Sequence, residues 1–300
     1  MTKKINVSVV CATHMGEKKI NKLVWCIYNN YIWPREILIC GTSGLDMRFI
    51  PNKIVLALNI KFIHSKIKNQ ITQRNNGIKK SKSDYILQID DDVKINRNFF
   101  QKLEKYTKKK NFVEKKIISA LILQKNNILQ AGSWNMIYKK YYLFRKLIWF
   151  LNYFKKINEY SVLESGRCIP YIENFNGLLD KNVSNAEWLC STVLYHRSFR
   201  KKIIYLNDFS KKAYYEDVLF SHQLYKKNYN LIIDKNIIGF HESQPYTSLL
   251  TFIQTIKMQY ALVKFFKKKK FLFYIDVLIF FFIHLIRDIY VLYILKNSNK

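Results

Sequence analysis

The first ninety residues alternate between short apolar runs and segments whose apolar side chains recur at helical spacing. Residues 7–12 are mostly β-branched and end in small and polar side chains, which predicts a buried strand. Residues 17–30 carry apolar side chains three and four positions apart, which predicts a helix that ends before Pro34. By the same criteria, further strands are predicted at 36–40, 55–63 and 85–89, and a further helix at 70–81.

Strands and helices in this order favour an α/β fold with a mostly parallel central sheet. In such sheets, ligands bind beyond the carboxyl ends of the strands. Three polar groups fall at the predicted ends: Thr13, then Thr42 with Ser43, and then an acidic triplet at residues 90–92. We therefore expect a binding site where these groups meet.

The pattern is less regular between residues 111 and 185. Residues 117–123 predict another strand. Residues 138–154 are aromatic and basic, which predicts an amphipathic helix or a hairpin whose aromatic side chains either pack on the domain or contact a membrane. Residues 188–195 are again strand-like, and residues 216–226 predict a helix.

The C-terminal segment differs in composition from the rest of the chain. Four lysines at 267–270 precede a nearly apolar run at 271–286, and a second apolar run follows Arg287 and Asp288. The first run is shorter than the roughly 20 residues that span a bilayer, and a longer span would place both charges in hydrocarbon. We expect a helix or helix pair on an anionic membrane surface, with a spanning or re-entrant helix and a buried core helix as alternatives.

These patterns predict a catalytic domain over residues 1–245 and membrane-associated helices over 246–300. Residues 1–6 are polar and lack the apolar region of a secretory signal, so we expect the catalytic part on the cytoplasmic face of the membrane. The five cysteines include no CxxC pair, which indicates reduced thiols and neither a disulfide framework nor a zinc site.

The composition excludes a disordered chain, because 49% of the 300 residues are hydrophobic and 16% are aromatic. The 51 Lys and Arg residues outnumber the 21 Asp and Glu residues, giving a net charge of +30. Such a charge can attract nucleic acid, anionic membranes or anionic substrates, or it can reflect an A/T-rich coding bias. The charge alone therefore names no partner.

The acidic triplet Asp90, Asp91 and Asp92 is the strongest chemical signal in the sequence. Like charges at this separation repel, and a divalent cation or strong hydrogen-bond donors usually relieve such a cluster. Mg²⁺ and Mn²⁺ prefer carboxylate oxygens and leave positions open for phosphate oxygens. The alternative is a solvated acidic turn, which the preceding apolar strand and the lysine-rich surroundings make less suitable.

Other candidate groups lie before and after the triplet. Arg74 and Asn75 can contact phosphate, or Arg74 can act as a structural counter-ion of the triplet. Glu216 and Asp217 begin a predicted helix, where a carboxylate either caps the helix or serves as a general base. His241 follows a strand-like run and is a metal ligand, a phosphate donor or a polar loop residue.

In combination, these residues resemble the family 2 glycosyltransferases of the GT-A fold, over about residues 5–245. The resemblance rests on the order of loose motifs rather than on any one of them. They are Thr13 after the first strand, residues 34–39, residues 74–77, residues 85–92, Trp188 with its small-residue loop, and Glu216-Asp217.

The resemblance implies that a sugar is transferred with inversion from a nucleoside-diphosphate sugar to a hydroxyl of a glycan or lipid-linked acceptor, and we expect this reaction to serve cell-surface polysaccharide synthesis. It assigns Asp92 and Asp90 to the metal, with Asp90 nearer the ribose and His241 as a further candidate ligand. Asp217 matches the catalytic base, with Glu216 as the alternative. The residues expected to bind the nucleotide sugar are Thr13, Thr42, Ser43, Arg74, Asn75, Asp90, Asp91, Trp188, Cys190 and Ser191.

The sequence departs from the family pattern in two places. An acidic residue that often contacts the nucleotide base is replaced by residues 40–43, and the usual basic residue soon after Thr13 is missing. A nucleotidyl- or phosphotransferase is a second hypothesis, but the glycine-rich phosphate loop that it predicts is absent. A nucleic-acid-binding protein is a third, but the lysines are scattered and the triplet repels phosphate, so no nucleic-acid partner is expected. An inactive, membrane-associated member of the same fold is the fourth, but the presence of both acidic motifs argues against it.

Overall fold

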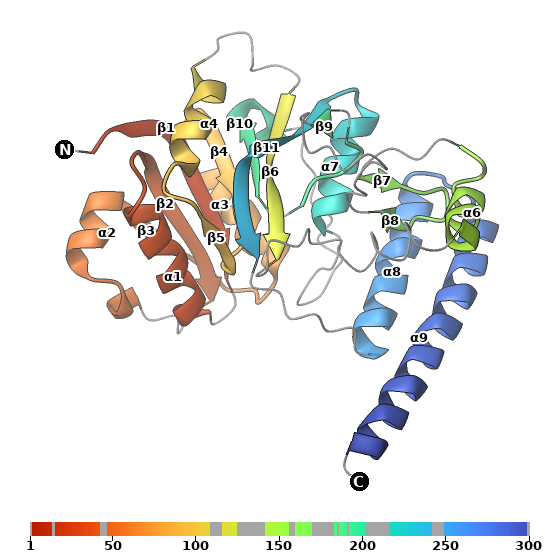
Figure 1. Ribbon diagram of the computed structural model, residues 1–300. Coiled ribbons are helices and arrows are strands. Elements are labelled where there is room, and N and C mark those ends of the chain that lie inside the picture. Colours follow the sequence, from red (N-terminus) through yellow and green to blue (C-terminus); the bar gives the residue numbers. More distant parts are fainter. Residues whose placement is uncertain are drawn as a thin grey trace.

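The computed structural model describes residues 2–13, 16–42, 47–108, 116–124, 142–155, 160–169, 183–184, 186–190, 192–201, 216–241 and 249–298. The strands among these residues form a nine-stranded sheet at the centre, with α1 and α2 toward one end and the C-terminal helices toward the other (Figure 1). Eight strands follow the order β3-β2-β1-β4-β10-β6-β11-β5, and β9 pairs with β11.

The N-terminal half of the sheet is parallel, as the alternation of strands and helices predicts. Its strands are β1 (Lys4–Ala12), β2 (Trp33–Thr42), β3 (Ile60–Ser65) and β4 (Tyr85–Gln88). The helices between them are α1 (Glu17–Tyr28), α2 (Asn52–Leu58) and α3 (Gln70–Lys80), with the short 3-10 helix η1 (Met47–Phe49) before α2. The strand predicted at 55–63 was wrong in its first half, because residues 55–58 belong to α2 and Asn59 ends that helix in a left-handed conformation.

Gly77 lets α3 approach the sheet closely. A Cβ atom at this position would lie 2.5 Å from Sγ of Cys40 and 2.6 Å from Cγ1 of Val10, both closer than real contacts allow. The lack of a side chain at Gly77 therefore fixes the depth at which α3 packs. Arg74, one turn earlier, is consequently buried at the sheet and lies near the end of β4.

Beyond β4 the sheet becomes mixed. Here β10 (Val193–His196) runs antiparallel to β4 and β6 (Lys116–Gln124), while β11 (Asn230–His241) runs parallel to β6. The strands β5 (Val93–Ile95) and β9 (Val183–Ser184) pair antiparallel with β11. The helical elements described in this part of the chain are α4 (Phe99–Thr107), which packs against β1 and β11, the 3-10 helix η3 (Arg197–Lys201) and α7 (Glu216–Lys226), which packs against β11.

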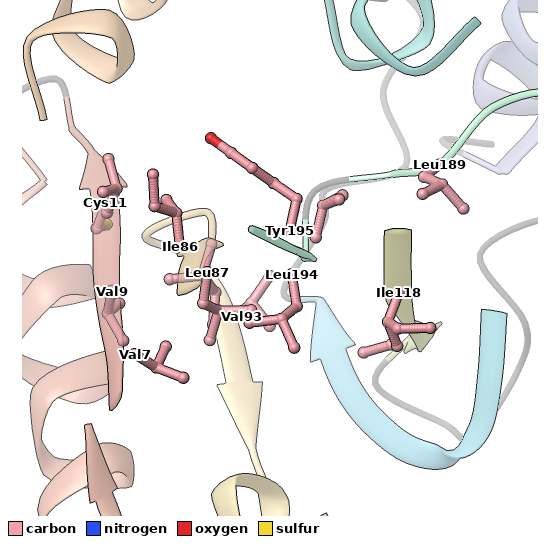
Figure 2. Close-up of a cluster of buried hydrophobic side chains, with 14 of the residues drawn as sticks. Val7, Val9, Cys11, Ile86, Leu87, Val93, Ile118, Leu189, Leu194 and Tyr195 are labelled. Atoms are coloured by element: carbon pink, nitrogen blue, oxygen red, sulfur yellow. The ribbon is translucent and has the colours of Figure 1, made fainter. Parts of the chain in front are cut away.

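Buried side chains from β1, β4, β10 and β6 form one continuous core across the sheet (Figure 2). Tyr195 is almost fully buried there, and its hydroxyl accepts a 2.6 Å hydrogen bond from Nε2 of Gln88. The four described cysteines that lie in the core are reduced, and Cys26 is half-buried and reduced as well. The sheet therefore provides a rigid base for the polar groups at its strand ends.

A second cluster of elements lies beside the sheet. It comprises α6 (Tyr142–Leu151), the small hairpin of β7 (Ser161–Val162) and β8 (Cys168–Ile169), α8 (Leu249–Phe265) and α9 (Lys270–Ser298). Within the segment 138–154, residues 142–151 are helical, as one of the two predicted alternatives requires, and residues 138–141 lie outside the described residues. Among the described residues, no helix is both long and apolar enough to cross a membrane.

Candidate active site

The candidate site forms where the strands β1, β4 and β11 end and the helix α7 begins. The acidic triplet turns the chain from β4 into β5, and β5 pairs with the end of β11 so that His241 lies opposite Val93. Thr13 follows β1, and its amide donates a 2.9 Å hydrogen bond to the carbonyl of Cys40 at the neighbouring strand β2. These polar residues therefore gather at one edge of the sheet, as the parallel topology predicts.

Asp90, Asp92 and His241 form a group that could hold a metal ion. Each offers one ligand atom, and these atoms all lie within 4.8 Å of one another. Nε2 of His241 lies 3.0 Å from Oδ1 of Asp92, while its Nδ1 is buried without a hydrogen-bond partner. Two carboxylates and one imidazole suit Mn²⁺ and are acceptable to Mg²⁺, so the residues fit a divalent cation.

The electrostatics of this group keep Asp92 ionised. Burial alone would raise the pKa of Asp92, but the hydrogen bond and charge of His241 and the charge of Lys19 lower it to about 2. Burial lowers the pKa of His241, and the interaction with Asp92 more than offsets this, so the pKa lies above its ordinary value. The Asp92 carboxylate is therefore available to a cation across the physiological pH range.

Asp91 is not part of this group and bonds to Thr13 instead. Its Oδ2 accepts a 2.7 Å hydrogen bond from the hydroxyl of Thr13, and burial raises its pKa. Gly16 closes over the same pair, because a Cβ there would lie 2.6 Å from Oδ2 of Asp91 and 2.8 Å from Oγ1 of Thr13. Asp91 and Thr13 thus fix the turn that directs Asp90 and Asp92 toward His241.

Arg74 joins the triplet to the start of α7. Its guanidinium forms ion pairs with Asp90 and with Glu216, and both Arg74 and Glu216 are buried. The sequence left open whether Arg74 contacts phosphate or neutralises the triplet, and the structure places it as a counter-ion of both carboxylates. Glu216 is consequently held in an ion pair rather than directed at solvent.

Asp217 begins α7 next to Glu216 but has a different environment. It is half-buried, and its Oδ1 accepts a 2.9 Å hydrogen bond from the amide of Val218. Burial and the nearby charge of Asp90 raise its pKa to about 6, although Arg74 opposes this shift. A carboxylate with a raised pKa beside a cation-binding group has the properties of a general base.

Lys19 is a site residue that the sequence reasoning missed. Its Nζ lies 3.2 Å from Oδ2 of Asp92, and Lys19 and Lys22 line a shallow depression next to Asp91 and Asp92. The basic residue expected soon after Thr13 is thus supplied from the first turn of α1. The signal was present in the sequence, since a helix starting at Glu17 directs its first turn toward the strand ends.

The remaining predicted residues are less central in the structure. Trp188 and Cys190 are buried in the core, where Trp188 packs edge-on against Tyr160 at 5.1 Å. Thr42, the last residue of β2, and Asn75, in the middle of α3, are both half-buried. Ser43 and Ser191 lie outside the described residues.

Comparisons with known proteins identify relatives of this arrangement. The sequence profile of glycosyl transferase family 2 matches residues 49–152, which include the acidic triplet and Arg74. No curated protein sequence matches the chain. Solved structures match over 86% of the chain: TarS of S. aureus with 15% identity and a TM-score of 0.53, and GalNAc-T7 with UDP, GalNAc and Mn²⁺ with 13% identity and a TM-score of 0.58.

A shorter form of TarS, residues 1–349, matches in complex with UDP-GlcNAc at 13% identity and a TM-score of 0.51. The chain covers 39% of the TarS chain, 47% of the GalNAc-T7 chain and 66% of the shorter TarS chain. It therefore spans less than two thirds of each of these proteins. At such low identity, the similarity establishes the fold and leaves the substrates to the site itself.

Proposed function

We propose that the chain transfers a sugar from a nucleoside-diphosphate sugar to an acceptor hydroxyl. The match of the glycosyl transferase family 2 profile to residues 49–152 and the GT-A fold shared with the similar solved structures support this proposal. The observation that carries this proposal is the group Asp90, Asp92 and His241, with Asp217 close enough to feel the charges of Asp90 and Arg74. The UDP, UDP-GlcNAc and Mn²⁺ complexes of the similar structures make a uridine diphosphate sugar the first donor to test.

Asp90, Asp92 and His241 would hold Mg²⁺ or Mn²⁺ beside the diphosphate. A divalent cation there supplies positive charge that offsets the charge developing on the departing diphosphate. Lys19 and Arg74 add fixed positive charge on either side of the triplet. Thr13, Asp91 and Gly16 keep the turn in place, so that the two ligand carboxylates are oriented before the donor binds.

Asp217 is the catalytic base of this proposal. Its carboxylate accepts the proton of the acceptor hydroxyl, the hydroxyl oxygen forms a bond to the anomeric carbon, and the bond from that carbon to the diphosphate breaks. The nucleoside diphosphate leaves with the electron pair of the broken bond, and attack opposite to it inverts the anomeric configuration. Glu216 is the weaker candidate, because Arg74 already holds its carboxylate.

The proposal extends to the acceptor and to the cellular role. We propose a hexosyltransferase whose acceptor is a glycan or a lipid-linked glycan, acting in cell-surface polysaccharide synthesis on the cytoplasmic face of a membrane. The apolar and basic C-terminal helices support a membrane-proximal acceptor, because they would keep the enzyme near a lipid carrier.

A donor-hydrolysis screen tests this function directly. UDP-, GDP-, dTDP- and CMP-sugars are incubated with the protein in the presence of Mn²⁺, Mg²⁺ or a chelator, and nucleotide release is measured. We expect release from one donor class, stimulated by Mn²⁺ and reduced by a factor of about 10²–10⁴ in Asp92→Asn. Asp84→Asn is the matched control, since Asp84 lies at the opposite end of β4 and pairs with Arg197 and Asn6.

The outcomes separate the parts of the proposal. Activity that is unchanged by chelation and by Asp92→Asn would exclude the metal site. A normal transfer rate in Asp217→Asn would exclude Asp217 as the base, and retention of the anomeric configuration in the NMR spectrum of the product would exclude direct displacement. Transfer of a nucleotidyl or phosphoryl group in place of the sugar would favour the second enzyme class.

A further inference from the structure

The long helix α9 is apolar on two opposite faces. Its inner face packs against α6 and α8, where Phe280 is buried and Ile275 and Ile279 are partly buried. Seven large apolar side chains of α9 are 42–60% exposed, and six of them, all but Ile283, fall along one stripe that forms the outer face of the helix. They are Phe271, Tyr274, Leu278, Phe281, Phe282 and Leu285.

A water-exposed helix normally carries polar side chains on its outer face. Between residues 271 and 285, however, the only acidic or basic side chain of Asp, Glu, Lys or Arg type is Asp276, and it is fully buried. The outer face therefore exposes about four turns of uninterrupted apolar surface. Patches of this kind mark binding surfaces rather than ordinary solvent-facing helices.

The C-terminal end of α6 extends this apolar stripe. Trp149, Tyr153 and Phe154 are 45–54% exposed, and Tyr153 lies 6.3 Å from the ring of Phe271. Tyr153 and Phe154 both have positive φ angles, 53° and 58°, which are unfavourable for bulky side chains. The ring of Phe154 lies 4.8 Å from that of Trp149 and 6.3 Å from that of Tyr153, so three aromatic rings cluster at the surface next to the start of α9.

Lysines border the same surface. Nζ of Lys269 lies 5.0 Å from the ring centre of Tyr153, which joins the basic and aromatic groups. The other exposed lysines around the start of α9 and on α6 are Lys146, Lys264, Lys267 and Lys270. Exposed aromatic and aliphatic side chains bordered by lysines match the interfacial region of an anionic bilayer, where rings enter the headgroup layer and ammonium groups contact lipid phosphates.

A buried ion pair fixes α9 on the protein. Nε of Arg167 donates hydrogen bonds of 2.8 and 2.9 Å to the two carboxylate oxygens of Asp276, and the hydroxyl of Ser165 donates one of 2.9 Å. The guanidinium also stacks on Phe280, with its central carbon 3.3 Å from the ring centre. A helix held in this way presents its outer face to a surface without leaving the protein.

We propose that the exposed side chains of α6 and α9, together with the lysines that border them, bind the surface of an anionic lipid bilayer. A second copy of the chain is a less suitable occupant, because pairing these faces would bring two lysine clusters of a +30 chain together. In this arrangement the protein lies on the membrane rather than spanning it, and α9 is the main contact.

Vesicle flotation tests this surface. The full chain is mixed with phosphatidylcholine vesicles with and without phosphatidylglycerol, and the bound fraction is measured at low and at physiological salt. The double variant Leu278→Gln/Phe282→Gln is expected to bind at least about 10-fold more weakly, since each substitution removes buried apolar area. The triple variant Lys267→Gln/Lys269→Gln/Lys270→Gln is expected to lose about 100-fold on anionic vesicles only.

Matched controls lie at the other end of the sheet. Leu56 on α2 is 80% exposed, so Leu56→Gln makes the same chemical change away from α9 (Figure 1). Lys53→Gln/Lys79→Gln/Lys80→Gln removes three exposed lysines from α2 and α3. Both controls should bind vesicles as the wild-type chain does, and circular dichroism checks that all variants are folded.

Three results would overturn the proposal. The wild-type chain could fail to bind anionic vesicles, or the controls could lose as much binding as the α9 variants. Light scattering could instead show a dimer that Leu278→Gln/Phe282→Gln dissociates, in which case α9 is a self-association face. Donor hydrolysis in solution is measured separately, so a failure of membrane binding is distinguishable from a failure of the proposed transferase activity.

Discussion

Replacing Asp276 with alanine tests how α9 is held on the protein. Asp276 is 0% exposed, and its carboxylate accepts hydrogen bonds from Arg167 and Ser165. Asp276→Ala leaves the Arg167 guanidinium buried without its counter-ion. Breaking a buried pair from one side costs about 3–5 kcal/mol of unfolding free energy. At about 2–3 °C per kcal/mol, the midpoint of thermal unfolding should fall by about 6–15 °C.

The double variant Arg167→Met/Asp276→Leu separates charge burial from packing. It removes both charges and keeps apolar volume in the site, so its stability should lie within about 1–2 kcal/mol of wild type. Urea unfolding followed by circular dichroism measures both variants, and hydrogen exchange across residues 270–285 shows whether α9 opens first. If Asp276→Ala were as stable as wild type, or if the double variant were the less stable of the two, the ion pair would not hold the helix.

Three further predictions concern the active site and the sheet. The pKa of Asp217 is raised to about 6 and a base must be deprotonated, so a plot of log kcat/KM for transfer against pH should fall with unit slope below about pH 6. This dependence should be absent from Asp217→Asn, and a wild-type profile that stays flat down to pH 5 would contradict the assignment. Gly16→Ala should raise the Mn²⁺ concentration for half-maximal activity roughly tenfold, because the alanine Cβ displaces Asp91 at a cost of about 1–2 kcal/mol. An unchanged Mn²⁺ dependence would show that the turn tolerates the alanine side chain. Burial raises the pKa of Glu36, but Lys61, Ser8 and the amide of Lys82 lower it overall, so the ionised Glu36 stabilises the fold above its unfolded pKa and this contribution is lost as pH falls below about 4.5. The free energy of unfolding of Glu36→Gln should therefore depend less on pH in this range, and the same acid dependence in the variant and the wild-type chain would refute the assignment.

Local patterns were sufficient for most of the elements. The strand and helix predictions at 7–12, 17–30, 70–81 and 216–226 are confirmed within a few residues, because periodic burial is written directly into the order of apolar side chains. The strand predicted at 55–63 failed at its start because a short apolar segment has no decisive periodicity. Residues 55–58 instead belong to helix α2, which buries Ile54 and Leu58 in the core.

The sequence by itself determined the α/β alternation and the position of the acidic triplet at a strand end, since both depend on neighbours along the chain. Tertiary structure alone decided how the carboxylates divide: Asp91 bonds to Thr13, Asp92 faces His241, and Glu216 pairs with Arg74. These pairings follow from the strand order and from the cost of burying a charge without a partner, which no local pattern encodes. The same holds for α9, whose apolar sequence gives it two apolar faces, while packing against α6 and α8 decides which one stays exposed.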